Sequence, residues 1–371
     1  MSAADILVIG GGIAGLSAAA RLSPHAKVIV LEAEEQIGFH SSGRSATMLH
    51  YALGDRLIRA LTLASRPFFD DPPEHFDAIG YRMPVLVHAR DDERDALDAL
   101  YADIAPFAKL ERLDAAGVHA LCPLLRDDAR HGIADLDGLR LDPHALLQGN
   151  LRQLRSRGGE LRTGMRIERI ERGVSSWTAT SESGERFAAP LLVNAAGAWA
   201  DRVAALAGLA PLGLEPKRRT IITFDAPAGA SLDGLPFTKT VGDELYFAPE
   251  SGRLFASPMD EVPSDPCDAQ PDEYEVALAA SRMGERTIVE VRRIHSKWAG
   301  LRSFTPDRHP AVGFWPDCDG FFWLAGQGGA GLQTSPAIAE IVESLIAGTP
   351  WPVGDVDAAE LSPGRFFRQT A

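Results

Sequence analysis

The chain contains little cysteine. Only Cys122, Cys267 and Cys318 occur among 371 residues, and their spacing matches no metal-binding pattern. A sparse, odd number of scattered cysteines is typical of proteins from a reducing compartment, where disulfides are rare. The sequence therefore predicts no metal site and a cytoplasmic location.

Basic residues and long apolar runs are also scarce. Lys and Arg number 37 against 51 Asp and Glu, giving a formal net charge of −14. Nucleic acids and anionic membranes attract basic surfaces, so neither is expected as a main partner. Residues 6–20 are apolar but lack a preceding basic segment and are interrupted by glycines, unlike a signal peptide. No other run approaches the ~18–20 apolar residues of a membrane span, so we expect a soluble protein.

The first thirty residues predict a strand–helix–strand unit. Residues 6–9 form a short apolar run of the kind found in buried strands, and residues 13–22 are rich in alanine, as in a helix. Residues 27–31 are β-branched and apolar and predict a second strand. Parallel strands joined in this way lie in a sheet that is covered on both faces.

The later segments predict two interleaved domains. We expect further elements in this order: a strand over 81–88 with Pro84 marking an edge or bulge, a strand over 191–194, a helix over 199–206, several short antiparallel strands over 220–254, a strand over 321–325 and a helix over 332–347. The predicted fold is α/β, with a Rossmann-like dinucleotide-binding domain (1–78, 143–213 and 303–371) interleaved with an α+β substrate domain built on an antiparallel sheet (79–142 and 214–302).

A glycine pattern marks a dinucleotide site. Gly10, Gly12 and Gly15 follow the first strand and open the first helix, where such glycines allow a tight turn, close approach of a pyrophosphate and close helix packing. The helix N-terminus offers unpaired N–H groups to an anion. Glu32 lies 20 residues after Gly12, where a carboxylate holds ribose hydroxyls and repels the 2′-phosphate of NADP. NAD and FAD both remain open at this point, and the alternative is a glycine-rich turn that binds nothing.

Further segments resemble one family. Residues 40–46 (HSSGRSA), 193–199 (VNAAGAW), 300–302 (GLR), 305–313 and 326–332 (GQGGAGL) are similar, in order, to motifs of the D-amino-acid oxidase and dehydrogenase superfamily. That superfamily includes glycine oxidase and sarcosine oxidase. Within that superfamily, four segments of this sequence most resemble bacterial D-arginine dehydrogenase: HSSGRSA, PLGLEPKRR, WAGLRSF and GQGGAGLQTS.

The resemblance implies a non-covalent FAD. Members with covalent flavin carry a cysteine shortly before the Thr-Pro-Asp stretch, where residues 301–304 here contain no thiol. The helix after residue 332 would direct its N-terminus at the flavin pyrimidine, where reduction places negative charge. The expected FAD-binding residues are Gly10, Gly12, Ile13, Ala14, Gly15, Glu32, Ala33, His40, Ser41, Ser42, Gly43, Arg44, Ser45, Ala46, Arg166, Ala196, Gly197, Trp199, Gly328, Gly329, Ala330, Gly331, Leu332 and Gln333.

The resemblance also implies a carboxylate clamp. Arg302 and Arg219 are expected to bind the substrate carboxylate in the bidentate manner that suits arginine, and Tyr246 to add a hydroxyl donor. Two alternatives stay open. Arg302 can instead form an internal salt bridge, and Arg218 rather than Arg219 can be the inward residue of an alternating strand.

Two departures from the D-arginine enzyme bear on the substrate. Where that enzyme carries a glutamate that holds a cationic side chain, this sequence has Met83, Pro84 and Val85, and a buried guanidinium without a carboxylate partner is costly. A neutral or apolar side chain is therefore expected. His50 and Tyr51 lie on a loop that differs from that enzyme and can close over the ligand, with His50 as a proton acceptor; a solvent-exposed histidine is the alternative.

Together these observations predict an FAD-dependent oxidative deamination. A D-amino acid would lose hydride to the flavin, and the imine would hydrolyse to a 2-oxo acid and ammonia, with oxygen or a quinone-type respiratory acceptor reoxidising the flavin. The alternatives are an oxidase or dehydrogenase of an N-methyl or cyclic amino acid or a 2-hydroxy acid, the flavin subunit of a larger dehydrogenase complex, and a nicotinamide enzyme. The sequence does not indicate an oligomeric state.

Overall fold

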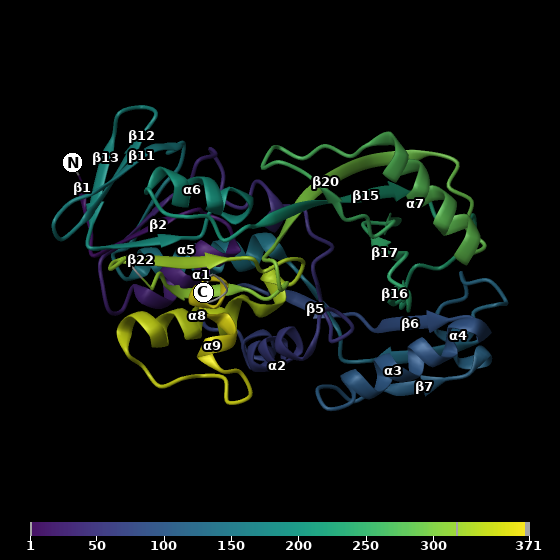
Figure 1. Cartoon of the computed structure of the whole chain (residues 1–371). Helices are drawn as coiled ribbons and strands as arrows, with labels where there is room; N and C mark the ends of the chain where they lie inside the picture. The colour runs from purple at the N-terminus through teal and green to yellow at the C-terminus, as the bar shows by residue number, and fades with distance from the viewer. Residues whose placement is uncertain (1, 317, 368–371) are drawn as a thin grey trace.

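The computed structural model describes residues 2–316 and 318–367. Its elements gather around two large sheets that lie side by side, one near both chain termini and the other on the far side of the molecule (Figure 1). The fold is α/β, and each sheet draws its strands from separated stretches of the chain.

The first sheet has six strands, and its strands are parallel except at one edge. Its central strands β2 and β3 are four-residue apolar runs that are buried throughout, and β14 is buried except at Leu191, because helices or other strands cover both faces. Only β21 runs antiparallel to its neighbour. In spatial order the strands are β10 (Glu160–Arg162), β3 (Val28–Leu31), β2 (Ile6–Ile9), β14 (Leu191–Asn194), β22 (Phe321–Ala325) and β21 (Ala311–Phe314).

Helices cover one face of this sheet. The alanines of α1 (Ile13–Leu22) allow it to pack closely between α5 (Pro143–Ser156) and α8 (Gly331–Ala347), and α8 also packs on α2 (Arg56–Asp70). The other face is covered by α6 (Ala200–Leu206) and a four-stranded sheet. That small sheet consists of β1 (Ser2–Ala3), β13 (Arg186–Ala189), β12 (Trp177–Ser181) and β11 (Ile167–Arg172).

The second sheet is larger and almost entirely antiparallel; only β16 and β6 pair in parallel. Helices α3 (Arg94–Ile104), α4 (Ala115–Leu121) and α7 (Glu273–Arg286) pack against it. Its strands are β19 (Val262–Pro263), β15 (Glu215–Phe224), β18 (Arg253–Ser257), β17 (Tyr246–Glu250), β16 (Phe237–Thr240), β6 (Val85–Ala89), β8 (His131–Asp135) and β7 (Glu111–Leu113), with β20 (Ile294–Phe304) pairing along β15.

The predicted strand over 81–88 is wrong as a single element. The chain forms β5 (Gly80–Arg82) and then β6, and the two strands belong to different sheets because Pro84 between them has no N–H to continue a ladder. Strand β5 joins β4 (Met48–Leu49) and β9 (Leu139–Leu141) in a three-stranded sheet. The predicted boundaries of the two interleaved domains stay a proposal. Strand β20 crosses the predicted boundary between residues 302 and 303.

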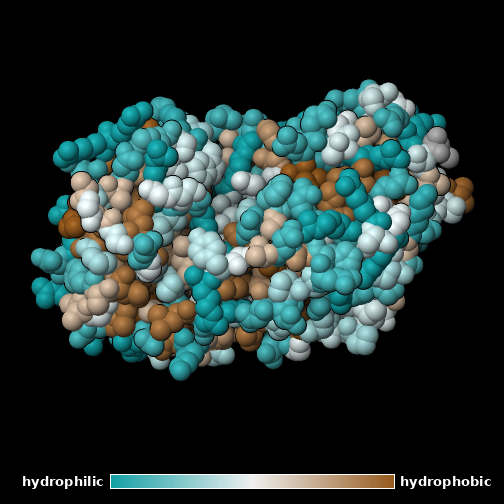
Figure 2. Space-filling model, turned by 180° about the vertical axis from the view of Figure 1, so that it is seen from behind, coloured by the Kyte–Doolittle hydropathy of each residue, from teal (hydrophilic) through white to brown (hydrophobic). Residues whose placement is uncertain are grey.

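The remaining elements are short. They are α9 (Ala358–Leu361) and the 3-10 turns η1 (Ser41–Gly43), η2 (Asp91–Glu93), η3 (Gly197–Trp199) and η4 (Pro363–Phe366). Seen from behind, hydrophilic residues cover most of the surface and hydrophobic ones form separate patches (Figure 2). Among the described residues, no helix combines the length and apolar character that a bilayer crossing requires.

Candidate functional site

Two adjoining cavities form one cleft at the carboxyl ends of the parallel strands. The outer part, about 1430 Å³, lies over the ends of β2, β3 and β14, and the inner part, about 830 Å³, reaches the end of β22 and the β15–β20 pair. They meet at Gly12, Ser41, Ser42, Ala195 and Gly197, which line both. Ligands of open α/β sheets bind at this edge.

The glycines of the first turn make room that no other residue would leave. Gly10 has a φ of +113°, and a Cβ there would lie 2.4 Å from the carbonyl oxygen of Ala195. A Cβ on Gly15 would lie 1.9 Å from the carbonyl oxygen of Gly10, so only glycine lets α1 pack this close. Gly12 is the N-cap of α1 and lines the cleft, which directs the helix N-terminus toward an anion in it.

Glu32 is held in place by backbone donors. Its carboxylate accepts hydrogen bonds from the N–H of Gly11 at 2.6 Å and of Glu34 at 2.8 Å. Burial raises the pKa of Glu32 above its usual value, while these two N–H groups oppose the rise. Because the carboxylate lines the cleft and keeps free lone pairs, it is placed to accept hydrogen bonds from ribose hydroxyls.

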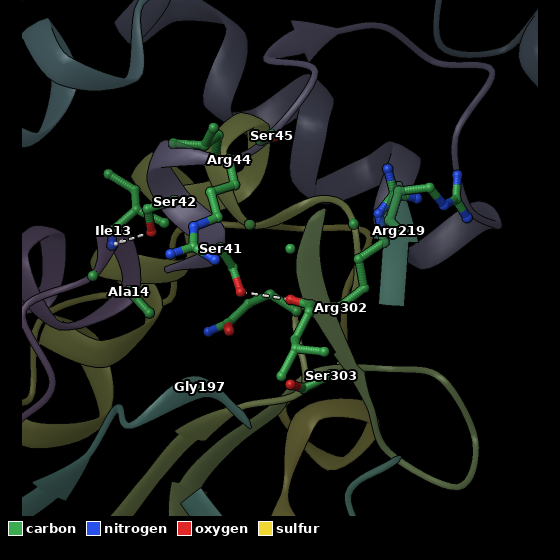
Figure 3. A pocket seen from close by; sticks show the side chains of 18 of the residues that line it. Ile13, Ala14, Ser41, Ser42, Arg44, Ser45, Gly197, Arg219, Arg302 and Ser303 are labelled. Carbon is green, nitrogen blue, oxygen red and sulfur yellow. Dashed lines mark hydrogen bonds between the residues drawn. The ribbon is translucent and has the colours of Figure 1, made fainter. Parts of the chain in front are cut away.

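The predicted segment 40–46 bridges the two sheets. Ser42 Oγ accepts the N–H of Ile13 at 3.0 Å, and Ser41 Oγ donates to the carbonyl of Leu301 on β20 at 2.5 Å (Figure 3). Arg44 also lines the inner cavity, and its guanidinium pairs with Asp268 at 2.6 Å. Ser45, Ala46 and Ala14 line the inner cavity. Gly43 does not line this cleft; glycine is needed there because a Cβ would lie 2.6 Å from the carbonyl oxygen of Gly38.

Other predicted cofactor residues line the outer cavity. The ring of His40 lies 4.5 Å from that of Trp199, centroid to centroid, and His40 and Arg166 both contact Glu34, at 3.0 and 3.1 Å. This wall combines ring faces with paired charges, which suits a stacked purine. Ala33 and Ala196 lie beside it.

The glycine-rich turn before α8 closes the inner cavity. Gly328 has a φ of +55°, and a Cβ on Gly329 would lie 2.9 Å from the guanidinium of Arg302. Helix α8 begins at Gly331 after its N-cap Ala330, with no side chain capping its first N–H groups, and Gly331 and Leu332 line the cavity. Its N-terminus therefore presents positive partial charge to the cleft.

The side chain of Gln333 points away from the cleft, so any contact of this residue with FAD would come from its backbone. Its Oε1 accepts the N–H of His50 at 3.3 Å, and its Nε2 donates to the His50 carbonyl at 3.3 Å and to Thr62 Oγ1 at 2.8 Å. Gln333 is 2% exposed and does not line the cleft. In the first turn of α8, two residues after Gly331, its side chain faces the neighbouring elements and links α8 to them.

The register of β15 and β20 brings the two predicted arginines together. Lys217 lies opposite Arg302 and Arg219 opposite Gly300, so Arg219 and Arg302 share one face of the ladder. Both line the inner cavity (Figure 3). Arg218 points the other way, where it pairs with Glu275 on α7 at 3.1 Å. Arg219 is therefore the inward residue.

Arg302 has no hydrogen-bond or ion-pair partner among the described residues, so an internal salt bridge does not explain it. It faces the cavity but is enclosed by protein. Burial, and then the charge of Arg219, lower the pKa of Arg302 to about 10, which leaves it protonated at neutral pH. Such a cation is costly unless an anion joins it.

Two further donors beside Arg302 lack partners. Arg219 donates from Nε to the carbonyl of Asp260 at 2.7 Å and lies 3.5 Å from Glu261, but its buried Nη1 has no partner, and neither has the buried hydroxyl of Tyr246. Native proteins rarely leave buried polar groups unpaired. Donors from Arg219, Tyr246 and Arg302 therefore face one cavity that suits a carboxylate.

His50 was expected either to close over the ligand or to be exposed to solvent, and the structure places it in neither position. It is 6% exposed and lines a separate small cavity with Tyr51 and Asp135, while Phe237 lies against its ring at 5.4 Å. Burial, then the charges of Lys239 and Arg302, lower the pKa of His50 to about 3. It is neither a surface residue nor a lid over the cleft, and so weak a base is unsuited to accepting a proton at neutral pH.

Sequence reasoning missed several lining residues. Ile221 lies two positions after Arg219 on the same strand face, so the alternation of β15 was the signal that could have found it. Gln327 lies inside the recognised GQGGAGL segment, and its Nε2 is buried without a partner. Ala195 and Ser303 also line the cavity.

Cys122, Cys267 and Cys318 are free thiols, and none of them lines either cavity. In residues 2–316 and 318–367, no group of three or more His, Cys, Asp or Glu is placed to hold a metal ion. The cleft has no thiol for a covalent flavin link.

Comparisons with known proteins agree with this geometry. The family model for FAD dependent oxidoreductases matches residues 5–345. The bifunctional tRNA 5-methylaminomethyl-2-thiouridine biosynthesis protein MnmC of Burkholderia multivorans is 27% identical over 97% of this chain, and the chain spans 59% of its length.

Solved structures share the fold. Glycine oxidase from Geobacillus kaustophilus superposes with a TM-score of 0.81 at 21% identity, covering 98% of this chain and 99% of that one. L-proline dehydrogenase from P. horikoshii superposes with a TM-score of 0.83 at 19% identity, covering 99% of this chain and 98% of that one. L-alpha-glycerophosphate oxidase from Mycoplasma pneumoniae with FAD bound superposes with a TM-score of 0.85 at 17% identity, covering 94% of this chain and 95% of that one. With the glycine cradle and Glu32 in place to hold the dinucleotide, the chain belongs to the FAD dependent oxidoreductase family and uses FAD.

Proposed function

We propose that the chain oxidises the Cα–N bond of an α-amino acid with a neutral or apolar side chain, preferably of D configuration, to an imine that hydrolyses to a 2-oxo acid and ammonia. The observation that carries this proposal is the enclosed guanidinium of Arg302, which lies in the cleft without a carboxylate partner beside the glycine turn of α8. An amino-acid carboxylate supplies the missing charge. The D configuration rests on the family resemblance.

The side chains of the inner cavity fix the orientation of such a substrate. Arg302 and Arg219 bind its carboxylate, and the Tyr246 hydroxyl donates a third hydrogen bond, which holds Cα in one position. FAD, when bound, supplies a hydride acceptor. The two cations also disfavour a substrate ammonium, so they lower its pKa and favour the neutral amine that oxidation requires. The released proton passes to water, since His50 is too weak a base.

Apolar residues surround the other side of the cavity. Met83 and Val85 are buried in one cluster with Ala46, Ile221 and Tyr246, which line the cavity. Among the described residues that line the inner cavity there is no aspartate or glutamate to pair with a basic side chain. This supports a neutral or apolar substrate over arginine or lysine.

The test is anaerobic reduction of the purified yellow protein. D- and L-forms of alanine, methionine, phenylalanine, arginine and lysine are mixed with it, and the loss of flavin absorbance is followed. We expect the neutral D-amino acids to bleach the flavin fastest. Fastest reduction by arginine or lysine would contradict the side-chain proposal, and no reduction by any amino acid would contradict the reaction.

Oxidation of a secondary amine is the second candidate. Two structures of the same fold are named L-proline dehydrogenase and iminodiacetate oxidase, and both of those substrates are secondary amines. A tRNA substrate, as named for MnmC, is disfavoured by the net charge of −14, since RNA binding needs basic surface. Proline, sarcosine, iminodiacetate and 2-hydroxyglutarate in the same reduction assay separate these candidates.

The electron acceptor is proposed to be oxygen or a quinone-type carrier. Peroxide release in air, compared with reduction of a soluble quinone, separates the two. The chain is also proposed to act without another subunit, because all parts of the cleft come from its own residues. Reduction by substrate only after a partner chain is added would overturn that.

A further inference from the structure

A third cavity, of about 1210 Å³, adjoins the inner one. It lies where β5 and β9 approach the β15–β20 pair, and it shares Ser45, Ala46 and Ile221 with the inner cavity. We propose that this third cavity, called the side chamber, receives the substrate side chain, and that the preferred substrate carries a large apolar or aromatic one. The inference rests on the proposed oxidation of an amino acid.

The β15–β20 ladder leads from the carboxylate clamp into the side chamber. On β15, Ile221 follows Arg219 on the same face, and on β20, Trp298 lies opposite Ile221 just as Gly300 lies opposite Arg219. Two residues along a strand span roughly 7 Å. A substrate held at Arg219 therefore meets Ile221 and Trp298 only with a side chain of several carbons. The methyl group of alanine does not reach them.

The walls of the side chamber favour an uncharged aromatic group. Phe255 and Trp298 line it, and the ring of Tyr81 stands at its exposed side. Trp298 is fixed there by a hydrogen bond from its Nε1 to the carbonyl of Arg44 at 3.2 Å. Aromatic walls bind large apolar groups through both buried area and ring geometry.

The charges of the side chamber are already used. Arg140 pairs with Glu250, donates to the carbonyl of Ala46 at 2.6 Å and lies 4.9 Å from the ring centroid of Phe255. Asp142 caps α5 by accepting the N–H of Ala145 at 2.9 Å. Asp142 is exposed and can remain solvated, and a charged substrate side chain in the interior of the chamber would compete with the Arg140–Glu250 pair, whereas an apolar one leaves that pair intact.

The experiment measures kcat/KM over a D-amino-acid series of alanine, valine, leucine, methionine, phenylalanine and tryptophan. We expect the wild-type value to rise at least tenfold from alanine to phenylalanine, because each buried methylene adds to discrimination. Tyr81→Ala and Trp298→Ala should each lower the phenylalanine-to-alanine ratio roughly tenfold. Tyr274→Ala is the matched control: that ring is 70% exposed, against 60% for Tyr81, and lines none of the cavities, so the ratio should stay unchanged.

A second readout does not require turnover. Phenylpropanoate should bind the FAD-loaded wild type about tenfold more tightly than propanoate, as judged by the change in flavin absorbance, and Trp298→Ala should remove most of that difference. A flat amino-acid series, or ratios unchanged in both variants that retain FAD, would overturn the side-chamber inference while leaving amino-acid oxidation intact. Failure of every amino acid to bleach the flavin would instead remove the proposed function.

Discussion

Replacing Arg302 by methionine should raise stability and lower activity together. Burial and the neighbouring Arg219 lower the pKa of Arg302 from 12.5 to about 10, so the folded protein disfavours the charged form at neutral pH. At ~1.4 kcal/mol per pKa unit this shift corresponds to about 3–4 kcal/mol, and partial exposure of Arg302 to the cavity reduces it to about 2 kcal/mol. For 371 residues, an unfolding entropy of ~2 cal/mol/K per residue converts this to a Tm increase of about 3 °C.

The same substitution removes the main carboxylate contact. A bidentate, charge-assisted pair contributes at least ~2 kcal/mol to binding of the transition state, so kcat/KM should fall roughly thirtyfold or more. The assays are thermal unfolding of the FAD-loaded protein without substrate, and stopped-flow flavin reduction with the best amino acid of the panel.

Arg218→Met is the matched control, because that arginine is on the opposite face of the same strand. Arg218 pairs with Glu275, which is only 7% exposed, so replacing Arg218 leaves a buried carboxylate unpaired and should lower Tm. Because Arg218 does not line the cleft, kcat/KM of this variant should stay close to that of the wild type. The reasoning is refuted if Arg302→Met lowers Tm as Arg218→Met does, or if it leaves kcat/KM unchanged.

Three further outcomes are expected. Gly15→Ala should abolish FAD retention, measured as flavin absorbance per protein, because its Cβ would lie 1.9 Å from a carbonyl oxygen, whereas Gly284→Ala, with no atom within 4 Å, should retain FAD. His50→Gln should keep the shape of the kcat/KM profile between pH 6 and 9, since burial holds the pKa of His50 at about 3; loss of an ionisation near pH 6–7 would contradict this. Burial lowers the pKa of His88 from 6.5 to about 4. The unfolded chain therefore binds a proton at a higher pH than the folded one, and the free energy of unfolding falls as pH drops from 6.5 toward 4. His88→Leu should reduce the slope of the unfolding free energy against pH, measured by urea titrations, by ~1.4 kcal/mol per pH unit.

The first turn of the nucleotide site could be predicted because its requirement is local. The backbone at Gly10 needs a positive φ, and α1 needs Gly15 to approach that turn, so the residue types alone reveal the geometry. The same holds for the buried strands 6–9, 191–194 and 321–325, whose apolar runs match β2, β14 and β22. These features depend on neighbours in sequence.

Features that depend on distant partners could not be predicted. The apolar residues around Pro84 indicate strand, but whether they extend one strand or start a second sheet depends on β9 and β16, which lie far along the chain. His50 is buried, and its backbone is hydrogen-bonded to Gln333 of α8; no local signal in the sequence shows that contact. The choice between Arg218 and Arg219 needed the register with β20.

The position of the positive charge would allow an acidic protein to bind the small anionic substrate that we propose. The chain carries a net charge of −14, which repels nucleic acids and other polyanions at long range, while salt screens it over about 8–10 Å. Within the cleft, Arg219 and Arg302 lie on one ladder face, and among the described residues Glu261 is the only carboxylate that pairs with either of them. A small carboxylate that enters the cavity therefore meets two cations at short range in a poorly solvated site, where their attraction is strong. For the proposed function, the net negative charge disfavours a nucleic acid at long range and the inner arginine pair favours a small carboxylate, which supports a free amino acid over a nucleic-acid substrate.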